Sequence, residues 1–228
     1  MFNLNIDNQT YRFPEKLSVA QWQSVTRYKL EDPTSWTRVL ATLMDIHPND
    51  LYNLSNKNLE LAMGIVFTLL KDRKETAWKD PHTLSFGEWV DLDCWIGEGI
   101  NNTLDKMLSI LAPDVETSAE ALYVIESYIT WRTYIYRQYA ELFGINVEDD
   151  EIVEEPVEKQ VGPKDIVNGW YSVIIGLASD NILNVDAVTE QPVLATLNFM
   201  AHQKQKQIAE NFKKLKQQKE YELQRRRK

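Results

Sequence analysis

The sequence contains little cysteine, glycine or proline. Its 228 residues include one Cys, eight Gly and eight Pro. A single cysteine, Cys94, excludes an internal disulfide framework and is typical of a reducing compartment. The low Gly and Pro content excludes collagen-like and low-complexity chains. With 43% hydrophobic and 26% charged residues, the composition indicates a globular protein rather than a disordered one.

Long hydrophobic runs are also missing. The longest, residues 65–70 and 173–178, are far shorter than the roughly 18 residues needed to cross a bilayer. The first residues have neither a basic head nor the apolar stretch of about 7–15 residues that marks a signal peptide. We therefore expect no membrane partner.

Motifs for nucleotide binding and hydrolysis do not occur. The sequence has no P-loop, no dinucleotide-binding glycine pattern and no nucleophile elbow. The three histidines, His47, His82 and His202, lack paired spacing, and with one cysteine they cannot supply a plausible zinc site. We expect no metal and no cofactor.

The densest carboxylates near aromatic residues are Glu88, Asp91 and Asp93. Glu88 and Asp91, three residues apart, could share a helix face and raise a pKa for acid–base chemistry. The favoured interpretation is that Glu88 caps a helix and that solvated acids follow it. The sequence therefore predicts a protein that is not an enzyme.

Charge is distributed unevenly along the chain. The formal net charge is −9, yet residues 202–228, the basic segment, hold ten basic and three acidic side chains, a net +7, and the remainder carries −16. Seven of the eleven residues in 148–158 are acidic. Because such blocks resist burial, we expect residues 146–162 to be an acidic linker between a body, 1–145, and a C-terminal helical unit, 163–228.

Apolar periodicity predicts a mainly α protein. Alternation over residues 2–13 predicts a small β-hairpin, and spacings of three and four predict helices afterwards. Helix starts are expected at Asp32-Pro33, at Ser55 and at Thr117 or Ser118, the last helix running to near Gly144. Gly97 and Gly99 are expected to break another helix.

Two helix starts resemble each other. Leu17-Ser-Val-Ala-Gln-Trp22 and Leu84-Ser-Phe-Gly-Glu-Trp89 are 67 residues apart, and both contain a capping box. Residues 39–43 and 107–111 form a weaker pair. Either the body contains a two-unit internal repeat, or a capped amphipathic helix simply recurs; both readings stay open.

The last predicted helix is long because no Gly or Pro lies between Pro192 and Lys228. Its apolar residues become sparse and form a narrow stripe, a pattern that favours binding to a partner helix. Its basic residues end in a cluster, which favours binding to phosphate groups. Four readings stay open for it: a partner protein, nucleic acid, no specific ligand, or docking on the chain's own acidic linker or a neighbouring subunit. The candidate partner-binding residues are Ile208, Phe212, Leu215, Arg225, Arg226, Arg227 and Lys228.

The opening alternation, with Leu17-Ser-x-x-Gln-Trp22 and Leu84-Ser-Phe-Gly-Glu-Trp-Val-Asp-Leu92, resembles small virion and tail-assembly proteins of tailed bacteriophages. The stretch Gly169-Trp-Tyr…Leu177-Ala…Pro192-Val-Leu-Ala-Thr-Leu-Asn-Phe-Met-Ala-His-Gln-Lys204 adds to it. Such proteins commonly begin with a short β element and continue as helices with Leu-Thr/Ser-x-x-Glu/Gln starts.

The resemblance implies a non-enzymatic assembly role in the virion or host cytoplasm. The chain would be a chaperone for the tape-measure protein or a structural component of the tail, baseplate or neck, with a homo-oligomer among its partners. The alternative is a nucleic-acid-associated phage protein that binds through its basic helix. The resemblance assigns no site residues.

Overall fold

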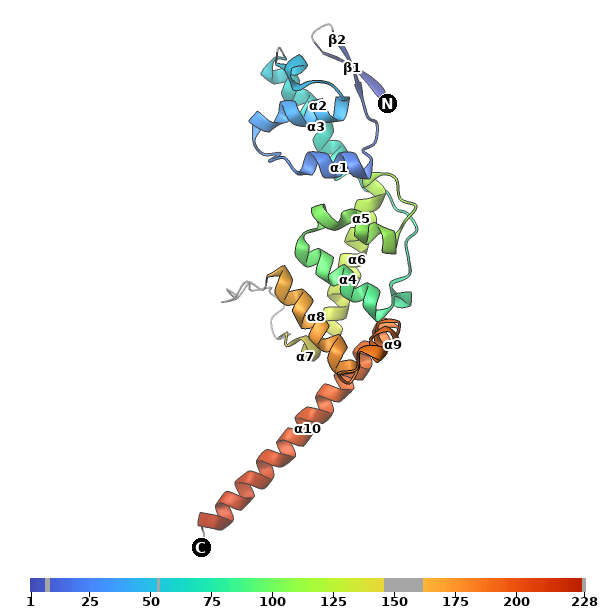
Figure 1. Ribbon diagram of the computed structural model, residues 1–228. Coiled ribbons are helices and arrows are strands. Elements are labelled where there is room, and N and C mark those ends of the chain that lie inside the picture. The colour runs from blue at the N-terminus through green and yellow to red at the C-terminus, as the bar shows by residue number, and fades with distance from the viewer. Residues whose placement is uncertain (7–8, 53, 146–161, 227–228) are drawn as a thin grey trace. The chain divides into compact units, whose positions relative to one another are not determined.

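The computed structural model describes residues 1–6, 9–52, 54–145 and 162–226. These residues form ten α-helices and one two-stranded antiparallel sheet (Figure 1). The predicted fold class, a multi-helix body with an N-terminal β-hairpin and a long protruding last helix, is confirmed. Within these ranges, no helix has the length and hydrophobicity of a membrane span. The predicted linker, residues 146–162, falls outside the described residues except for Gly162.

The chain divides into two compact units. Unit 1 comprises Met1–Lys79 and Leu92–Ile129, and unit 2 comprises Asp80–Asp91 and Thr130–Lys228. Helices α4 (Phe86–Glu98) and α6 (Ser118–Gln138) each contribute residues to both units.

Unit 1 begins with the hairpin. Strand β1 (Phe2–Ile6) pairs with β2 (Gln9–Phe13) so that Phe2 faces Phe13 and Ile6 faces Gln9. The two residues between the strands, 7 and 8, lie outside the described residues. The helices of this unit, besides its parts of α4 and α6, are α1 (Val19–Thr26), α2 (Trp36–Met44), α3 (Asn56–Lys71) and α5 (Ile100–Leu111). Phe13, Leu40, Leu51 and Met63 are among the buried residues of its core.

Unit 2 contains the remaining helices. These are α7 (Ala140–Phe143), α8 (Pro163–Leu177), α9 (Val185–Thr189) and α10 (Val193–Arg226). Single-turn 3₁₀ helices in the two units are η1 (Pro33–Ser35), η2 (Pro48–Leu51), η3 (Pro81–Thr83) and η4 (Ile182–Asn184).

An aromatic cluster forms the core of unit 2. Trp89 is fully buried, and its ring lies 4.8 Å from that of Trp170, edge to face, and 6.2 Å from that of Phe86. Tyr136 and Phe143 complete the cluster and stack on each other with centroids 4.3 Å apart. Such pairs add to the burial energy of the rings, so this cluster anchors α8 to α4 and α7.

Two predicted helix breaks need correction. Gly99, with φ of +99°, separates α4 from α5 as expected, but Gly97 lies inside α4. Glycine weakens a helix without ending it unless the backbone needs a conformation that other residues avoid, and only Gly99 has one. The helix predicted to run from 118 to near Gly144 ends at Gln138, because Tyr139 leaves helical geometry (φ −109°, ψ 31°) before α7 begins.

The two Leu-Ser helix starts build the same junction. At α1, Ser18 Oγ accepts from the Gln21 amide at 3.1 Å, and the Ser118 amide donates to the Leu17 carbonyl at 2.8 Å. At α4, Ser85 Oγ accepts from the Glu88 amide at 3.1 Å, and the Val193 amide donates to the Leu84 carbonyl at 3.0 Å. A reciprocal bond completes each bridge, from Val19 to Glu116 and from Phe86 to Gln191. Each capping box therefore also ties its helix to the start of a later helix.

Candidate protein-binding surface

Helix α10 has one face that packs against its own unit. Val193 and Leu197 on this face are fully buried. At the next residue, Tyr139 Oη donates to Asn198 Oδ1 at 3.0 Å. About two turns further, the Lys204 ammonium donates to the carbonyls of Glu141 and Leu142 at the end of α7. A lysine is favourable there because the last carbonyls of a helix carry partial negative charge. Burial, and then the neighbouring Tyr134, raises the pKa of Tyr139, so its hydroxyl stays protonated as the donor.

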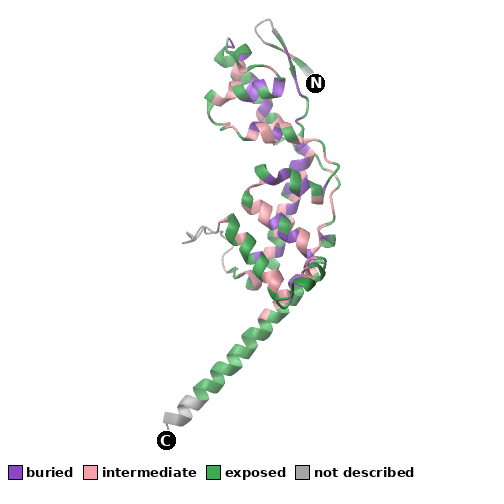
Figure 2. Cartoon of the chain, in the orientation of Figure 1, coloured by how far each residue is buried: buried purple, intermediate pink, exposed green. Residues whose placement is uncertain are grey.

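Beyond Lys204 the same face continues, and its residues up to 220 are exposed. At about 100° per residue, Ile208, Phe212 and Leu215 fall on the side of α10 that carries Leu197. Their exposed fractions are 37%, 70% and 54%. Figure 2 shows this part of α10 exposed along its length. We call these three residues the seam. They extend the apolar stripe that is buried at Val193 and Leu197 beyond the part of α10 that packs against the rest of unit 2.

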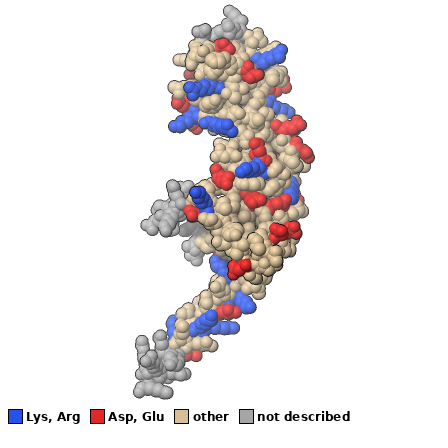
Figure 3. Space-filling model, in the orientation of Figure 1, with Lys and Arg blue, Asp and Glu red and all other residues tan. Residues whose placement is uncertain are grey.

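The described part of the basic segment surrounds the seam with charge. Six lysines and two glutamates lie between residues 202 and 220, a net +4 (Figure 3). Of the basic cluster predicted to contact phosphate, Arg225 and Arg226 belong to α10, whereas Arg227 and Lys228 lie outside the described residues.

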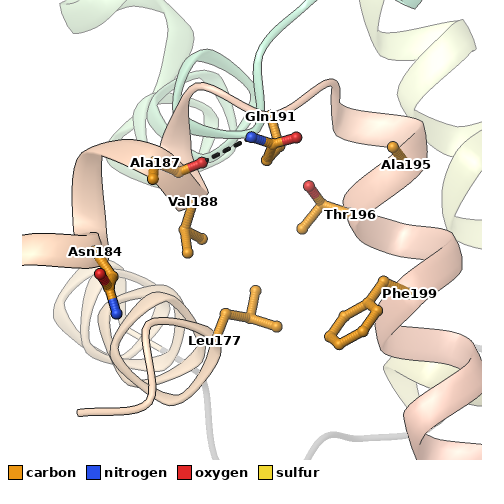
Figure 4. A pocket seen from close by; sticks show the side chains of 8 residues that line it. All are labelled: Leu177, Asn184, Ala187, Val188, Gln191, Ala195, Thr196 and Phe199. Carbon is orange, nitrogen blue, oxygen red and sulfur yellow. Dashed lines mark hydrogen bonds between the residues drawn. The ribbon is translucent and has the colours of Figure 1, made fainter. Parts of the chain in front are cut away.

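Unit 2 also contains an apolar groove that the sequence analysis missed. It lies between the end of α8, α9 and the first turns of α10 and has a volume of about 330 Å³. Figure 4 shows Leu177, Val188 and Phe199 pointing into a shared space, while Gln191 Nε2 is held by the Ala187 carbonyl at 2.9 Å. Its lining residues are Leu177, Asn184, Ala187, Val188, Gln191, Ala195, Thr196 and Phe199.

The groove and its borders differ in charge from the seam. Residues 177–199 contain three acids, Asp180, Asp186 and Glu190, all exposed, and no basic residue. Phe199 within the groove is 52% exposed, and Ile182 and Leu183, which directly precede the lining residue Asn184 in the chain, are 68% and 84% exposed. Large exposed apolar side chains of this kind mark interaction surfaces when they cluster.

The sequence carried a signal for the groove. Ala195 and Phe199 lie on the face of α10 opposite Leu197 and the seam. Apolar residues on two faces of a surface helix indicate two packing surfaces. The sequence predicts only the seam face, because the second surface also needs α9, whose five residues are too few for a periodic pattern.

The three carboxylates considered for catalysis have different surroundings. Glu88 accepts from the Ser85 amide at 2.9 Å, which confirms its predicted role as a cap. Burial raises the pKa of the Asp91 carboxyl, and the charge of Glu88 raises it further. The expectation of a solvated Asp93 is wrong: it is 4% exposed, because it follows the fully buried Trp89 by one helical turn.

Two of the three histidines, His47 and His82, lie at 3₁₀ turns. His47 caps η2, where its Nδ1 accepts from the Asn49 amide at 3.2 Å, and His82 belongs to η3. His202 lies on α10. Within the described ranges, no three His, Cys, Asp or Glu side chains are grouped as a metal site would need.

Comparison of the chain with protein-family models, with curated protein sequences and with solved structures finds no match.

Proposed function

We propose that this chain is a non-enzymatic assembly protein of a tailed bacteriophage, acting through protein–protein contacts in the virion or host cytoplasm. Its role is that of a structural component or a chaperone of the tail, baseplate or neck, and its partners include the tape-measure protein. The bacteriophage part of this proposal rests on the resemblance of the two Leu-Ser helix starts and of the stretch ending at Lys204.

The observation that carries the protein-binding part is the seam. Ile208, Phe212 and Leu215 continue a stripe that is buried at Leu197 on the same continuous helix, but they are themselves exposed. A preformed amphipathic helix binds a complementary groove with little ordering cost, in the helix-in-groove mode of recognition. Such a helix suits a chaperone that shields apolar helices and equally a component that joins neighbours in a particle.

Quantitative mass spectrometry tests this proposal on purified particles of the phage that encodes the chain. A fixed small copy number relative to the tape-measure or portal protein identifies a structural component. Presence in infected-cell lysate with absence from particles identifies a chaperone. Absence from both contradicts the proposal.

A second candidate is binding of nucleic acid by the basic segment. The net +4 of residues 202–220 favours it, since lysines that neutralise phosphates give salt-dependent affinity. Removal of residues 202–228 then abolishes salt-sensitive DNA binding by the chain. Under the favoured proposal, the full chain shows no such binding in a filter or anisotropy assay.

A further inference from the structure

We propose that the seam of one copy of this chain binds the apolar groove of a second copy, so that copies associate head to tail. This inference names one partner for the proposed assembly function and rests on it. The convex surface is Ile208, Phe212 and Leu215, and the concave surface is the groove lined by Leu177, Val188 and Phe199.

Opposite net charges favour the groove of a second copy as the binding site for the seam. The groove and its borders, residues 177–199, carry −3, and the helix around the seam, residues 202–220, carries +4. Pairing two seams with each other would instead bring the lysines of both helices together. Opposite charges at the rim of an apolar contact speed encounter and reject the wrong pairing.

The size of the groove fits the seam. About 330 Å³ lies at the lower end of the range for ligand sites and has room for a few apolar side chains rather than a whole helix. Phe212, the most exposed of the three at 70%, is the natural anchor, with Ile208 and Leu215 on either side of it. Buried aromatic anchors of this kind dominate the energy of interfaces.

The groove of the same copy is out of reach. Ala195 and Phe199 line the groove and belong to the same continuous helix as the seam, which has no Gly or Pro from Val193 to Arg226. Phe212 therefore lies about 20 Å farther along the helix axis than Phe199, on the opposite face. A straight helix cannot fold these two surfaces together, so the seam needs the groove of another molecule.

Such a contact joins two different surfaces and leaves one of each free. A heterologous contact extends into rings or helical arrays rather than stopping at a dimer. We therefore expect sedimentation velocity on the full chain to show a series of species that grows with concentration. Between about 0.1 M and 1 M salt, where the Debye length falls from about 10 Å to 3 Å, the association weakens. A monomer at every concentration, or association indifferent to salt, overturns the proposal.

Two variants break the contact from opposite sides. Phe212→Asp removes the anchor of the seam, and Ala195→Arg fills the groove and reduces the net charge of residues 177–199 from −3 to −2. Each is expected to weaken self-association at least about tenfold, as for loss of an interface hot spot. The matched control is Gln217→Asp, which places the same charge on the opposite face of α10 and leaves association unchanged.

Mixing the two variants separates this arrangement from every symmetric one. The Ala195→Arg protein keeps its seam and the Phe212→Asp protein keeps its groove, so together they form 1:1 heterodimers that grow no further. This rescue also shows that both variants are folded. If Ala195→Arg alone still associates, or if the mixture stays monomeric, the head-to-tail proposal is wrong. The copy-number measurement on particles is independent of these outcomes and tests the assembly function separately.

Discussion

Units 1 and 2 each contain a Leu-Ser helix start tied to a later helix, but the two junctions have different surroundings. In unit 1 the capping serine is followed by Val19 and Ala20, and the tied helix is α6. In unit 2 the corresponding residues are Phe86 and Gly87, and the tied helix is α10. The hydrogen bonds are the same, whereas the side chains beside them are not.

These substitutions decide what packs on each junction. Phe86 joins the aromatic cluster around Trp89, and Gly87 lets Thr189 of α9 approach so closely that an added Cβ would lie 3.0 Å from the Thr189 Cβ. The short helix α9, a wall of the groove, therefore lies against α4 at a position where unit 1 has alanine. A shared capping box fixes the junction, and two neighbouring residues adapt it to a binding surface.

The largest difference between the junctions is expected on truncation of their tryptophans. Trp89→Ala should cost about 3–5 kcal/mol, because Trp89 is completely buried in the aromatic cluster. Trp22→Ala should cost less, since Trp22 is at the edge of its core with 8% exposed. Urea denaturation followed by far-UV circular dichroism measures both.

Trp89→Phe is the control for this difference. It keeps a ring in the cluster and removes the buried Nε1 donor, which has no hydrogen-bond partner among the described residues. It should cost clearly less than Trp89→Ala. Equal losses for Trp22→Ala and Trp89→Ala would show that the two junctions do not differ as their burial indicates.

Substitutions of Gly87 in α4 and of Ala20 in α1, the second residues after the two capping serines, should change the free energy of unfolding less than the tryptophan substitutions do. Gly87→Ala should destabilise the protein by about 1 kcal/mol net, because the strain of overpacking against Thr189 outweighs the gain in helix propensity. Adding Thr189→Ala should recover part of this loss. Ala20→Gly in α1 should cost about 0.5–1 kcal/mol, from propensity alone. A stabilising Gly87→Ala, measured by urea denaturation, would contradict the close approach of α9.

Loss of either capping serine should cost about 1 kcal/mol. Ser85→Ala is expected to cost more than Ser18→Ala, since Ser85 is half-buried and Ser18 is exposed, so water replaces the lost bond less well at Ser85. Ser24→Ala, which changes a half-buried serine inside α1 that caps no helix, serves as the reference in the same denaturation assay. The reverse order would mean that burial does not distinguish the two caps.

The smallest effect concerns acid stability and belongs to unit 1 alone. Hydrogen bonds from Lys74 and then from Thr117 lower the pKa of the Glu120 carboxyl below its ordinary 4.5. Its contribution is complete above about pH 4.5 and is lost as the pH falls through the lowered pKa. Glu120→Gln should therefore flatten the acid limb of the stability profile, by about 0.2–1 kcal/mol near neutral pH.

Unit 2 supplies the control for this titration. The residue that corresponds to Glu120, three positions after the bridge, is Ala195 at the start of α10. Ala195→Gln introduces no titrating group and should leave the acid limb unchanged. An acid limb that survives Glu120→Gln would assign the pH dependence to other carboxylates.

Local chemistry made much of this fold predictable. The caps at Ser18, Ser55 and Ser85 follow from hydrogen bonding over three residues, and each appears where the sequence predicts it. The hairpin follows from alternation and the long last helix from its lack of Gly and Pro. The bridge between Leu84 and Val193 joins residues more than a hundred positions apart, so no local pattern predicts it.

The candidate site was predictable only in part. Ile208, Phe212 and Leu215 were found because a lone apolar seam among lysines stands out at helical spacing. The groove was not predicted, because it depends on how α8, α9 and α10 pack and because α9, with five residues, is too short for a periodic pattern. The break at Tyr139 is not predicted either, because nothing in residues 136–142 differs from a helix-forming sequence.

Helix α10 also has a consequence for how the protein melts. From Gln205 to Glu220 its side chains are all exposed, so this stretch owes its order to helix-forming residues and to a nucleus supplied by the packed turns before it. Such a helix frays progressively on heating, while the cores of the units unfold cooperatively. The far-UV ellipticity of the isolated chain should therefore slope well before the main transition, and any molecule that covers the seam should turn this slope into a flat baseline.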